Sequence, residues 1–298
     1  LFIVFLFWGF TRSALFGPSR GYIGAAASPS KKAASMAIIV VLLSASRTLG
    51  ALPSGFIVDT WGYRFVFFVA CGVALIGGSV LLIGLRQTRW VILKPITTSP
   101  SLANRTSFKN AISICRPLAP QCLVASLFFL GFGIVGTFLP LLAAQVVGGI
   151  SVTEVGFLFA ASGFVSMVLG ISLGRLADRA GKKKIMILGM LISGIALIGM
   201  AFATNYLWLI VVTVSQSMGM AMFSSASMGL LSDSVSSQRQ STAMGAYGGL
   251  CEDPGIIIGS ALGGFIWSAW GPQATFLTGA IAAGLGVVVS LVFIKESR

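Results

Sequence analysis

The sequence predicts an all-α membrane protein. Of its 298 residues, 56% are hydrophobic and 9% are charged, and the mean hydropathy is +0.97. Soluble domains average about 25% charged residues, so most of this surface cannot face water. Apolar segments of about 20 residues recur from end to end, and each is long enough to cross the bilayer as a helix. A helix satisfies its own backbone hydrogen bonds in lipid, so we expect one helical bundle.

Nine membrane spans are expected. The first contains Arg12 and Arg20 but lacks the basic N-terminal region of a signal peptide, so we interpret it as a spanning helix. The nine segments are residues 1–25, 34–57, 65–85, 120–146, 153–174, 184–203, 206–231, 242–267 and 273–294.

The basic residues predict the orientation of these spans. Sixteen of the twenty Lys and Arg lie in alternate loops, whereas the intervening loops contain a single one, Arg64. This distribution follows the positive-inside rule for a multi-pass protein of the plasma (inner) membrane, and it favours anionic lipid over nucleic acid as the partner of the basic residues. The segments expected on the cytoplasmic side are 26–34, 86–118, 174–184, 232–241 and the C-terminus.

An internal repeat divides the chain. Residues 50–67 and 259–276 align at an offset of 209, which makes spans two and three repeat as spans eight and nine. The identical residues in the two copies are Gly50, Gly55, Phe56, Ile57, Trp61, Gly62 and Phe67, paired with Gly259, Gly264, Phe265, Ile266, Trp270, Gly271 and Phe276. Each copy begins on the basic side, so we expect the halves to be related by an axis along the membrane normal.

The repeat also predicts a domain organisation. Spans four to six lack partners ahead of Leu1, so we expect a fragment that lacks three of twelve helices, with a nine-helix protein as the alternative. Residues 1–85 are then the last three helices of an N-terminal bundle, residues 86–118 a cytoplasmic linker rich in Ser, Thr, Pro and basic residues, and residues 119–298 a complete six-helix bundle.

A charged segment between spans five and six, GRLADRAGKKK at residues 174–184, carries a family resemblance. It resembles the G-x-L-x-D-R-x-G-R-K loop of the major facilitator superfamily, and FLPLLA at residues 138–143 is similar to the end of that family's seventh helix. The matching residues of the loop are Gly174, Leu176, Asp178, Arg179, Gly181, Lys182, Lys183 and Lys184. The resemblance covers essentially the whole chain and implies family helices four to twelve.

The resemblance implies a gate at the cytoplasmic side. In this interpretation Asp178 and Arg179 close an inner gate in the outward-facing state, and Asp178 is directed at the start of span two, around residues 34–37. From the residues alone, Gly174 permits close helix approach and Gly181 a tight reversal. The simpler interpretation is that these charges only set the topology.

Ionisable residues inside spans are the candidates for function. At mid-membrane each costs about 2.5–3.5 kcal/mol on insertion scales, so it should face a cavity or a partner. These residues are Arg12, Arg20, Arg47, Glu252 and Asp253. Arg12 and Arg20 are eight positions apart, about 80° around a helix, so both can reach one cavity.

Glu252 and Asp253 stand mid-way through span eight, directly before Pro254, where a broken helix can open a polar pocket. A carboxyl group in a low-dielectric site can exchange protons near neutral pH, so proton coupling is one hypothesis. A structural ion pair, with Arg47 or with a residue of the missing helices, is the other.

Span seven mixes hydroxyl groups with methionines in VTVSQSMGMAMFSSASMG, residues 212–229. Gln216 and Ser224 are candidate cavity residues, because soft side chains and dispersed hydroxyls suit varied apolar solutes. The same residue types are also ordinary in helix packing. A stripe of Gly255, Gly259 and Gly263 is interpreted as a helix-packing surface.

Several classes of chemistry are not expected. The sequence has no histidine, which excludes a His metal site and a Ser-His-Asp triad, and its four cysteines show no paired spacing. We expect no enzyme activity, no cofactor and a monomer that binds a small-molecule substrate.

The predicted function is secondary transport by alternating access. Proton-coupled efflux is the first interpretation, because the Gly-rich segments of spans two and eight resemble those of the family's antiporters. The alternatives are proton-coupled uptake of an organic anion held by Arg12 and Arg20, and a non-transporting scaffold or receptor of the same fold.

Overall fold

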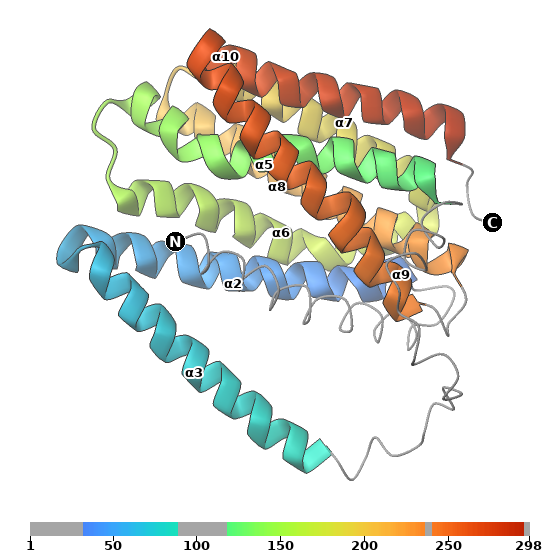
Figure 1. Cartoon of the computed structure of the whole chain (residues 1–298), viewed down its shortest axis with the longest axis horizontal. Coiled ribbons are helices and arrows are strands. Elements are labelled where there is room, and N and C mark those ends of the chain that lie inside the picture. Colours follow the sequence, from blue (N-terminus) through green and yellow to red (C-terminus); the bar gives the residue numbers. More distant parts are fainter. Residues whose placement is uncertain (1–31, 89–117, 236–239, 295–298) are drawn as a thin grey trace.

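The computed structural model of the chain describes residues 32–88, 118–235 and 240–294, and these are helical apart from turns and caps, without strands. Consecutive long helices run antiparallel and pack into a bundle, from which α3 diverges, and the short α9 leads into α10 (Figure 1). The helices are α2 (Lys32–Trp61), α3 (Tyr63–Thr88), α5 (Ala119–Val147), α6 (Val152–Ala180), α7 (Lys182–Ala201), α8 (Tyr206–Ser234), α9 (Gln240–Tyr247) and α10 (Asp253–Phe293), with a π-helical turn at Gly248–Glu252.

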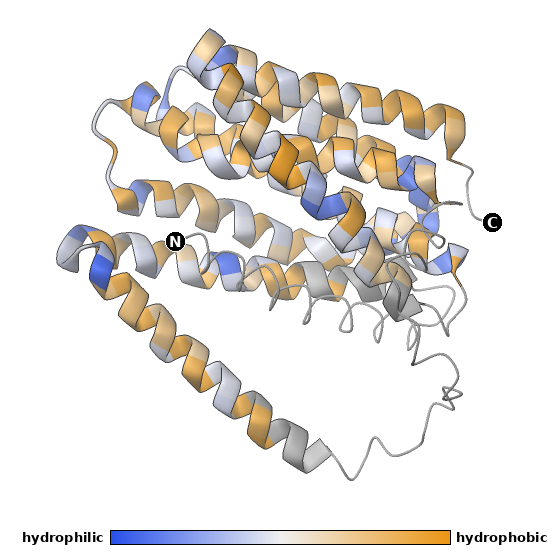
Figure 2. Cartoon of the chain, viewed as in Figure 1, coloured by the Kyte–Doolittle hydropathy of each residue, from blue (hydrophilic) through white to orange (hydrophobic). Residues whose placement is uncertain are grey.

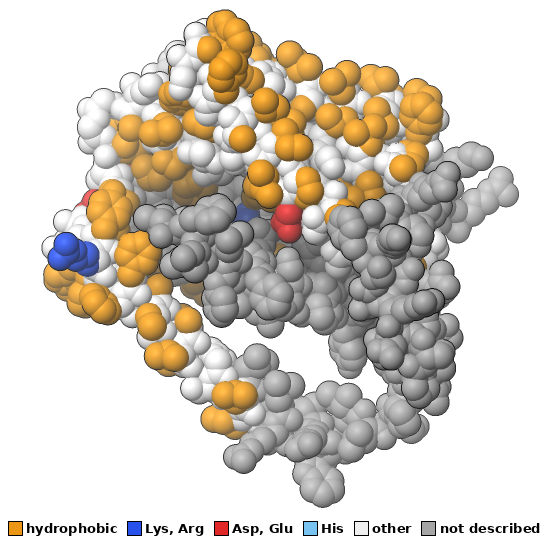
Figure 3. Space-filling model, in the orientation of Figure 1, with side chains coloured by type: hydrophobic (Ala, Val, Ile, Leu, Met, Phe, Trp, Pro, Cys, Tyr) orange, Lys and Arg blue, Asp and Glu red, His pale blue; other side chains and the backbone are white. Residues whose placement is uncertain are grey.

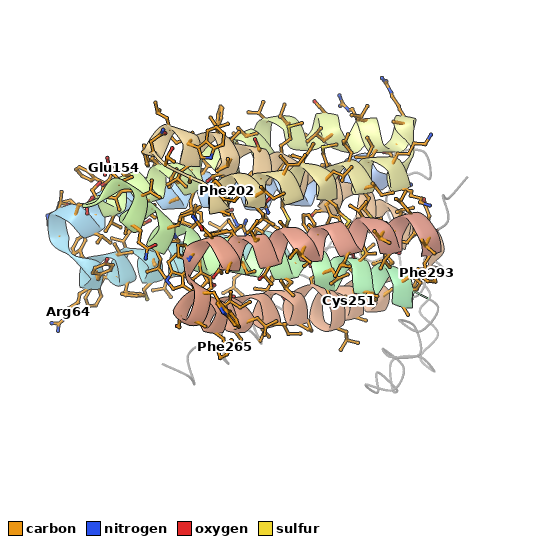
Figure 4. All side chains as sticks on the ribbon, turned by 90° about the horizontal axis from the view of Figure 1, so that it is seen from above. Arg64, Glu154, Phe202, Cys251, Phe265 and Phe293 are labelled. Atoms are coloured by element: carbon orange, nitrogen blue, oxygen red, sulfur yellow. The ribbon has the colours of Figure 1, made fainter. Side chains whose placement is uncertain are left out.

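The connections alternate between two ends of the bundle (Figure 1). One end, here called the Gly62 end, holds the turn at Gly62, the α5–α6 and α7–α8 connections and the bend in α10. The opposite end, here called the Lys182 end, holds the start of α2, the α6–α7 junction and the end of α8. In Figure 4, Arg64 and Glu154 lie at the first end and Phe293 at the second.

Within the described residues, seven helices are long and apolar enough to cross a membrane. This differs from the predicted nine spans for two reasons. The predicted span 1–25 lies outside the described residues, and α10 contains most of span eight and all but the last residue of span nine as two helical arms, residues 253–270 and 272–293. The arms meet at Gly271, whose φ of 82° and ψ of −174° break the helix immediately before Pro272.

The charged segment 174–184 is not the loop that the sequence predicted. Helix α6 continues to Ala180 and α7 begins at Lys182, so the chain reverses at Gly181 alone, with a φ of 104°. Across this reversal Lys182 Nζ lies 3.7 Å from the Asp178 carboxylate.

The core consists of two apolar clusters along the bundle. Near the Lys182 end, Phe128 of α5 stacks on Phe223 of α8 with ring centroids 3.9 Å apart. Near the Gly62 end, Trp267 stacks on Phe138 with centroids 5.2 Å apart, and Phe276 is fully buried beside it. Hydrophobic residues predominate along the helices in Figure 2, and many apolar side chains lie on the described surface in Figure 3, which suits a surface in contact with lipid tails.

Glycines bring helix backbones into contact. A β-carbon at Gly255 or Gly259 would collide with the backbone of Ser126 or Leu130 on α5, and one at Gly263 would collide with the Phe138 ring. The predicted packing role of this glycine stripe is therefore confirmed. In lipid, where apolar burial gives helices little reason to associate, such close contacts supply much of the packing energy.

Candidate functional site

A π-helical turn interrupts the helix that carries Glu252. Across this turn the N–H of Asp253 donates to the carbonyl of Gly248, five residues back, and Pro254 follows. Proline has no N–H, and its ring clashes with the carbonyl four residues earlier, so regular α-helix is disfavoured there. The π turn widens the helix where the sequence places its only adjacent pair of carboxylates, a kind of irregularity that is frequent at functional sites.

Glu252 is buried and Asp253 is half-buried. The exposed fraction of Glu252 is 4%, although the residue lies mid-way along an apolar span. The neighbouring Cys251, labelled in Figure 4, is 2% exposed. An ionisable side chain buried inside an apolar span is a candidate for function.

Helix α5 holds the π turn in position. The Ser126 hydroxyl donates to the Cys251 carbonyl at 2.8 Å, which satisfies an acceptor in the irregular turn. Gly255, one turn later, packs against the backbone of Ser126. Ser126 of α5 therefore contacts the backbone both just before and just after Glu252 in the chain.

A second set of buried polar groups lies one turn before Glu252. The hydroxyls of Tyr247 and Ser227 share a hydrogen bond, and Gln121 Nε2 donates to the Ser227 carbonyl at 2.8 Å. Tyr247 is 1% exposed. These groups connect α5, α8 and α9, so the segment that leads into the π turn is held by polar as well as apolar contacts.

Arg47 of α2 faces the same helix, α5. Its guanidinium lies 5.2 Å from the centroid of the Phe132 ring, within the range of a cation–π contact. Phe132 is six residues beyond Ser126, which is about 9 Å along the helix axis. The structure thus brings Arg47 and Glu252 to neighbouring stretches of α5, and an ion pair between them stays a prediction.

The polar residues of α8 were interpreted from the sequence either as lining a substrate cavity or as packing against other helices. Ser217 and Ser225 donate to carbonyls of their own helix, as packing residues do, and buried Ser224 contacts the sulfur of Met220 at 3.7 Å. Gln216 is different. It is 4% exposed, and its Oε1 lacks a hydrogen-bond partner among the described residues.

The remaining predicted cavity residues, Arg12 and Arg20, lie outside the described residues. The structure therefore leaves their predicted approach to a central cavity as a prediction.

The Lys182 end carries a cluster of ionised groups. Lys182 Nζ lies 2.6 Å from Asp233 at the end of α8 and 3.7 Å from Asp178 at the end of α6, so one lysine joins three helix ends. Lys183 Nζ donates to the Leu291 carbonyl in the last turn of α10 at 3.1 Å. These contacts tie the ends of α6, α7, α8 and α10 together.

The other predicted gate residues of segment 174–184 differ in their exposure to solvent. Gly174 is buried and Arg179 is exposed. The predicted contact of Asp178 with residues 34–37 involves side chains that the structure does not describe, so that contact stays a prediction. Antiparallel packing does place the start of α2 at the same end as Asp178 (Figure 1).

Several residues that hold the candidate site were not identified from the sequence. Ser126, Gln121 and Tyr247 are polar residues inside predicted spans. Polar side chains are costly to place in lipid, and this cost was a signal that could have found them. Asp233 had no such signal, because it follows an apolar span in a segment that is expected to be polar.

Comparison with known proteins finds a matching family profile and several similar proteins. The sequence profile of the Major Facilitator Superfamily matches residues 121–298. The multidrug resistance protein MdtG of Klebsiella pneumoniae (strain 342) is 32% identical over 174 residues, which cover 54% of this chain and 38% of that protein. The quinolone resistance protein NorA of Staphylococcus aureus (strain N315) is 27% identical over 172 residues, 58% of this chain and 43% of that protein.

The crystal structure of the human organic anion transporter MFSD10 (TETRAN) has the same fold. It superposes with a TM-score of 0.68 at 17% sequence identity, covering 91% of this chain and 66% of that one. The matched segments thus span less than half the length of the two resistance proteins and about two thirds of the solved structure.

Proposed function

Because the chain belongs to the major facilitator superfamily, we propose that the protein of which it forms all or part transports small molecules across a membrane by alternating access. We further propose that it exports amphipathic compounds in exchange for protons. The similarity to a multidrug resistance protein and a quinolone resistance protein supports efflux as the direction.

The observation that carries proton coupling is the buried carboxyl group of Glu252 on a π turn in mid-span. A charged carboxylate there is costly, so alternation between a protonated and an ionised form can be linked to a change of conformation or to binding of a cationic compound. Asp253 is less buried and belongs to the regular part of α10, so Glu252 is the stronger candidate.

The test is proton movement in vesicles that contain the full-length gene product. Ethidium added to wild-type vesicles should move protons in the opposite direction to the dye. Glu252→Gln should abolish this movement while leaving dye binding measurable, and Asp253→Asn, a matched neutralisation one residue away, should retain it. Dye-driven proton movement of wild-type size in Glu252→Gln would exclude Glu252 as the coupling group.

Orientation is a separate part of the proposal. We place the Lys182 end in the cytoplasm, because the Lys and Arg of residues 174–184 lie there and the positive-inside rule applies to such short connections. The lysines also suit contact with anionic lipid headgroups. A membrane-impermeant label that reacts with a single cysteine at Lys184 in intact cells would contradict this orientation.

A further inference from the structure

We propose that Asp59 is a latch at the Gly62 end, where it fastens the predicted N-terminal bundle to the predicted C-terminal one and must release when that end opens. The latch itself depends on contacts within the chain, and its place in a transport cycle depends on the proposed function.

The carboxylate of Asp59 completes the first turn of α6. It accepts hydrogen bonds from the N–H of Val152 at 3.2 Å and of Thr153 at 2.8 Å, and from the Thr153 hydroxyl at 2.5 Å. Asp59 lies in the last turn of α2, 93 residues earlier in the chain. Negative charge at a helix N-terminus is stabilising, and hydrogen bonds to a charged acceptor are stronger than neutral ones.

The four N–H groups that a helix leaves without internal partners are all accounted for here. The Ser151 hydroxyl accepts from the N–H of Glu154, and the Glu154 carboxylate accepts from the N–H of Ser151, which together form a capping box. That local cap leaves the N–H groups of Val152 and Thr153. A residue from α2, rather than one from α6 itself, accepts both.

The surrounding helix contact is close. Gly55 lies against the backbone of Val152 and Thr153, and Gly156 lies against the backbone of Ala51. Three turns from Asp59, the Thr48 hydroxyl lies 3.3 Å from the Ala160 carbonyl and also bonds within α2. Asp59 is thus the terminal contact of an antiparallel pair in which small residues let the backbones meet.

Towards the Lys182 end, α6 has another hydrogen-bonding partner. Ser166 donates to the Ser217 carbonyl of α8, inside the predicted C-terminal bundle. The polar contacts described between α2 and α6, from Thr48 and Asp59, lie on the side of Ser166 that is nearer the Gly62 end.

The internal repeat builds a second hairpin of the same kind without a carboxylate at the position of Asp59. At the offset of 209 its counterpart is Ser268, whose hydroxyl donates to the Gly264 carbonyl of its own helix at 3.0 Å. The neighbouring Trp and Gly are the same in both copies, whereas the carboxylate is present in one. The three hydrogen bonds are also exposed, so water can replace them when the helices separate.

Hydrogen–deuterium exchange of the full-length protein in lipid nanodiscs tests the latch without any substrate. In Asp59→Ala, amide exchange should increase about tenfold or more in peptides from both partners, residues 44–58 of α2 and 151–163 of α6, because a charge-assisted contact is lost. Asp59→Asn, which keeps one acceptor, should give a smaller increase. Ser268→Ala is the matched control and should leave both peptides unchanged.

Two results of the exchange experiment would overturn the latch. Faster exchange confined to residues 152–153, with α2 unchanged, would show that Asp59 is a local helix cap and would overturn the latch. No change in either helix would overturn it as well. Loss of proton coupling in the vesicle assay has no bearing on these exchange rates, so the latch and the proposed function can fail separately.

Discussion

The two hairpins of the internal repeat share a turn and differ in what surrounds it. In the first hairpin α2 and α3 meet at Gly62, with a φ of 81°, and in the second the arms of α10 meet at Gly271, with a φ of 82°. Yet Phe67, early in α3, is 74% exposed within the described structure, and its counterpart Phe276 is fully buried. The local sequence thus sets the turn, and the neighbouring helices set the burial.

The copies also differ at the residues of the candidate site. Glu252, Asp253 and Pro254 correspond to Leu43, Ser44 and Ala45, in a stretch of α2 that is regular α-helix. The turn is shared because both hairpins need it, whereas the carboxylates, the proline and the π turn belong to one copy. The residues in which the two copies differ therefore indicate the candidate site more directly than the glycines that the copies share.

The largest expected effect is a difference in stability between substitutions at Phe276 and at its counterpart Phe67. Phe276→Ala should destabilise the protein by about 3–5 kcal/mol, since it removes a buried aromatic ring from the cluster beside Trp267. Phe67→Ala should change stability by about 0.5 kcal/mol or less if lipid surrounds its ring. Unfolding in mixed micelles with increasing denaturing detergent measures both, and a large loss for Phe67→Ala would mean that protein covers that face of α3.

The two glycines should instead behave alike. Gly62→Ala and Gly271→Ala should each cost about 1–2 kcal/mol, because an L-residue is strained at positive φ. Crowding is not the cause, since an added β-carbon at either position meets open space among the described residues. Thermal unfolding in detergent measures both variants. A marked cost at one glycine with none at the other would show that the turns are not equivalent.

The smallest effect concerns the contact that holds the π turn. Ser126→Ala should cost about 1 kcal/mol, the net value of one hydrogen bond. It should also shift the pH midpoint of dye transport, because it frees the backbone next to Glu252. Ser225→Ala is the control, as that buried hydroxyl bonds within its own helix. An unchanged pH profile for Ser126→Ala would remove Ser126 from the coupling site.

Much of the fold was accessible from the sequence because lipid imposes simple rules. Hydropathy located eight spans within the described residues to within a few residues of the helix ends, except that α6 continues six residues past its predicted end. The repeat correctly paired Gly62 with Gly271. The merging of spans eight and nine into a bent α10 depends on the geometry of one glycine–proline step, which hydropathy does not report.

The candidate site was partly accessible for a related reason. A carboxylate in an apolar span is conspicuous, so Glu252 and Asp253 could be selected from the sequence. The π turn, the Ser126 contact and the Asp59 contact could not, because each depends on which backbone groups of distant helices come within hydrogen-bonding distance. Contacts of that kind are tertiary, and the local sequence on either side is compatible with ordinary helix.

The central claim is that the proton exchanged for substrate resides on Glu252. It is tested most directly by adding ethidium to the purified full-length protein in weakly buffered detergent and recording proton release with a pH indicator dye. The account predicts about one proton released per bound dye in wild type and in Asp253→Asn, and none in Glu252→Gln. Proton release of wild-type size from Glu252→Gln, with dye binding intact, would contradict it.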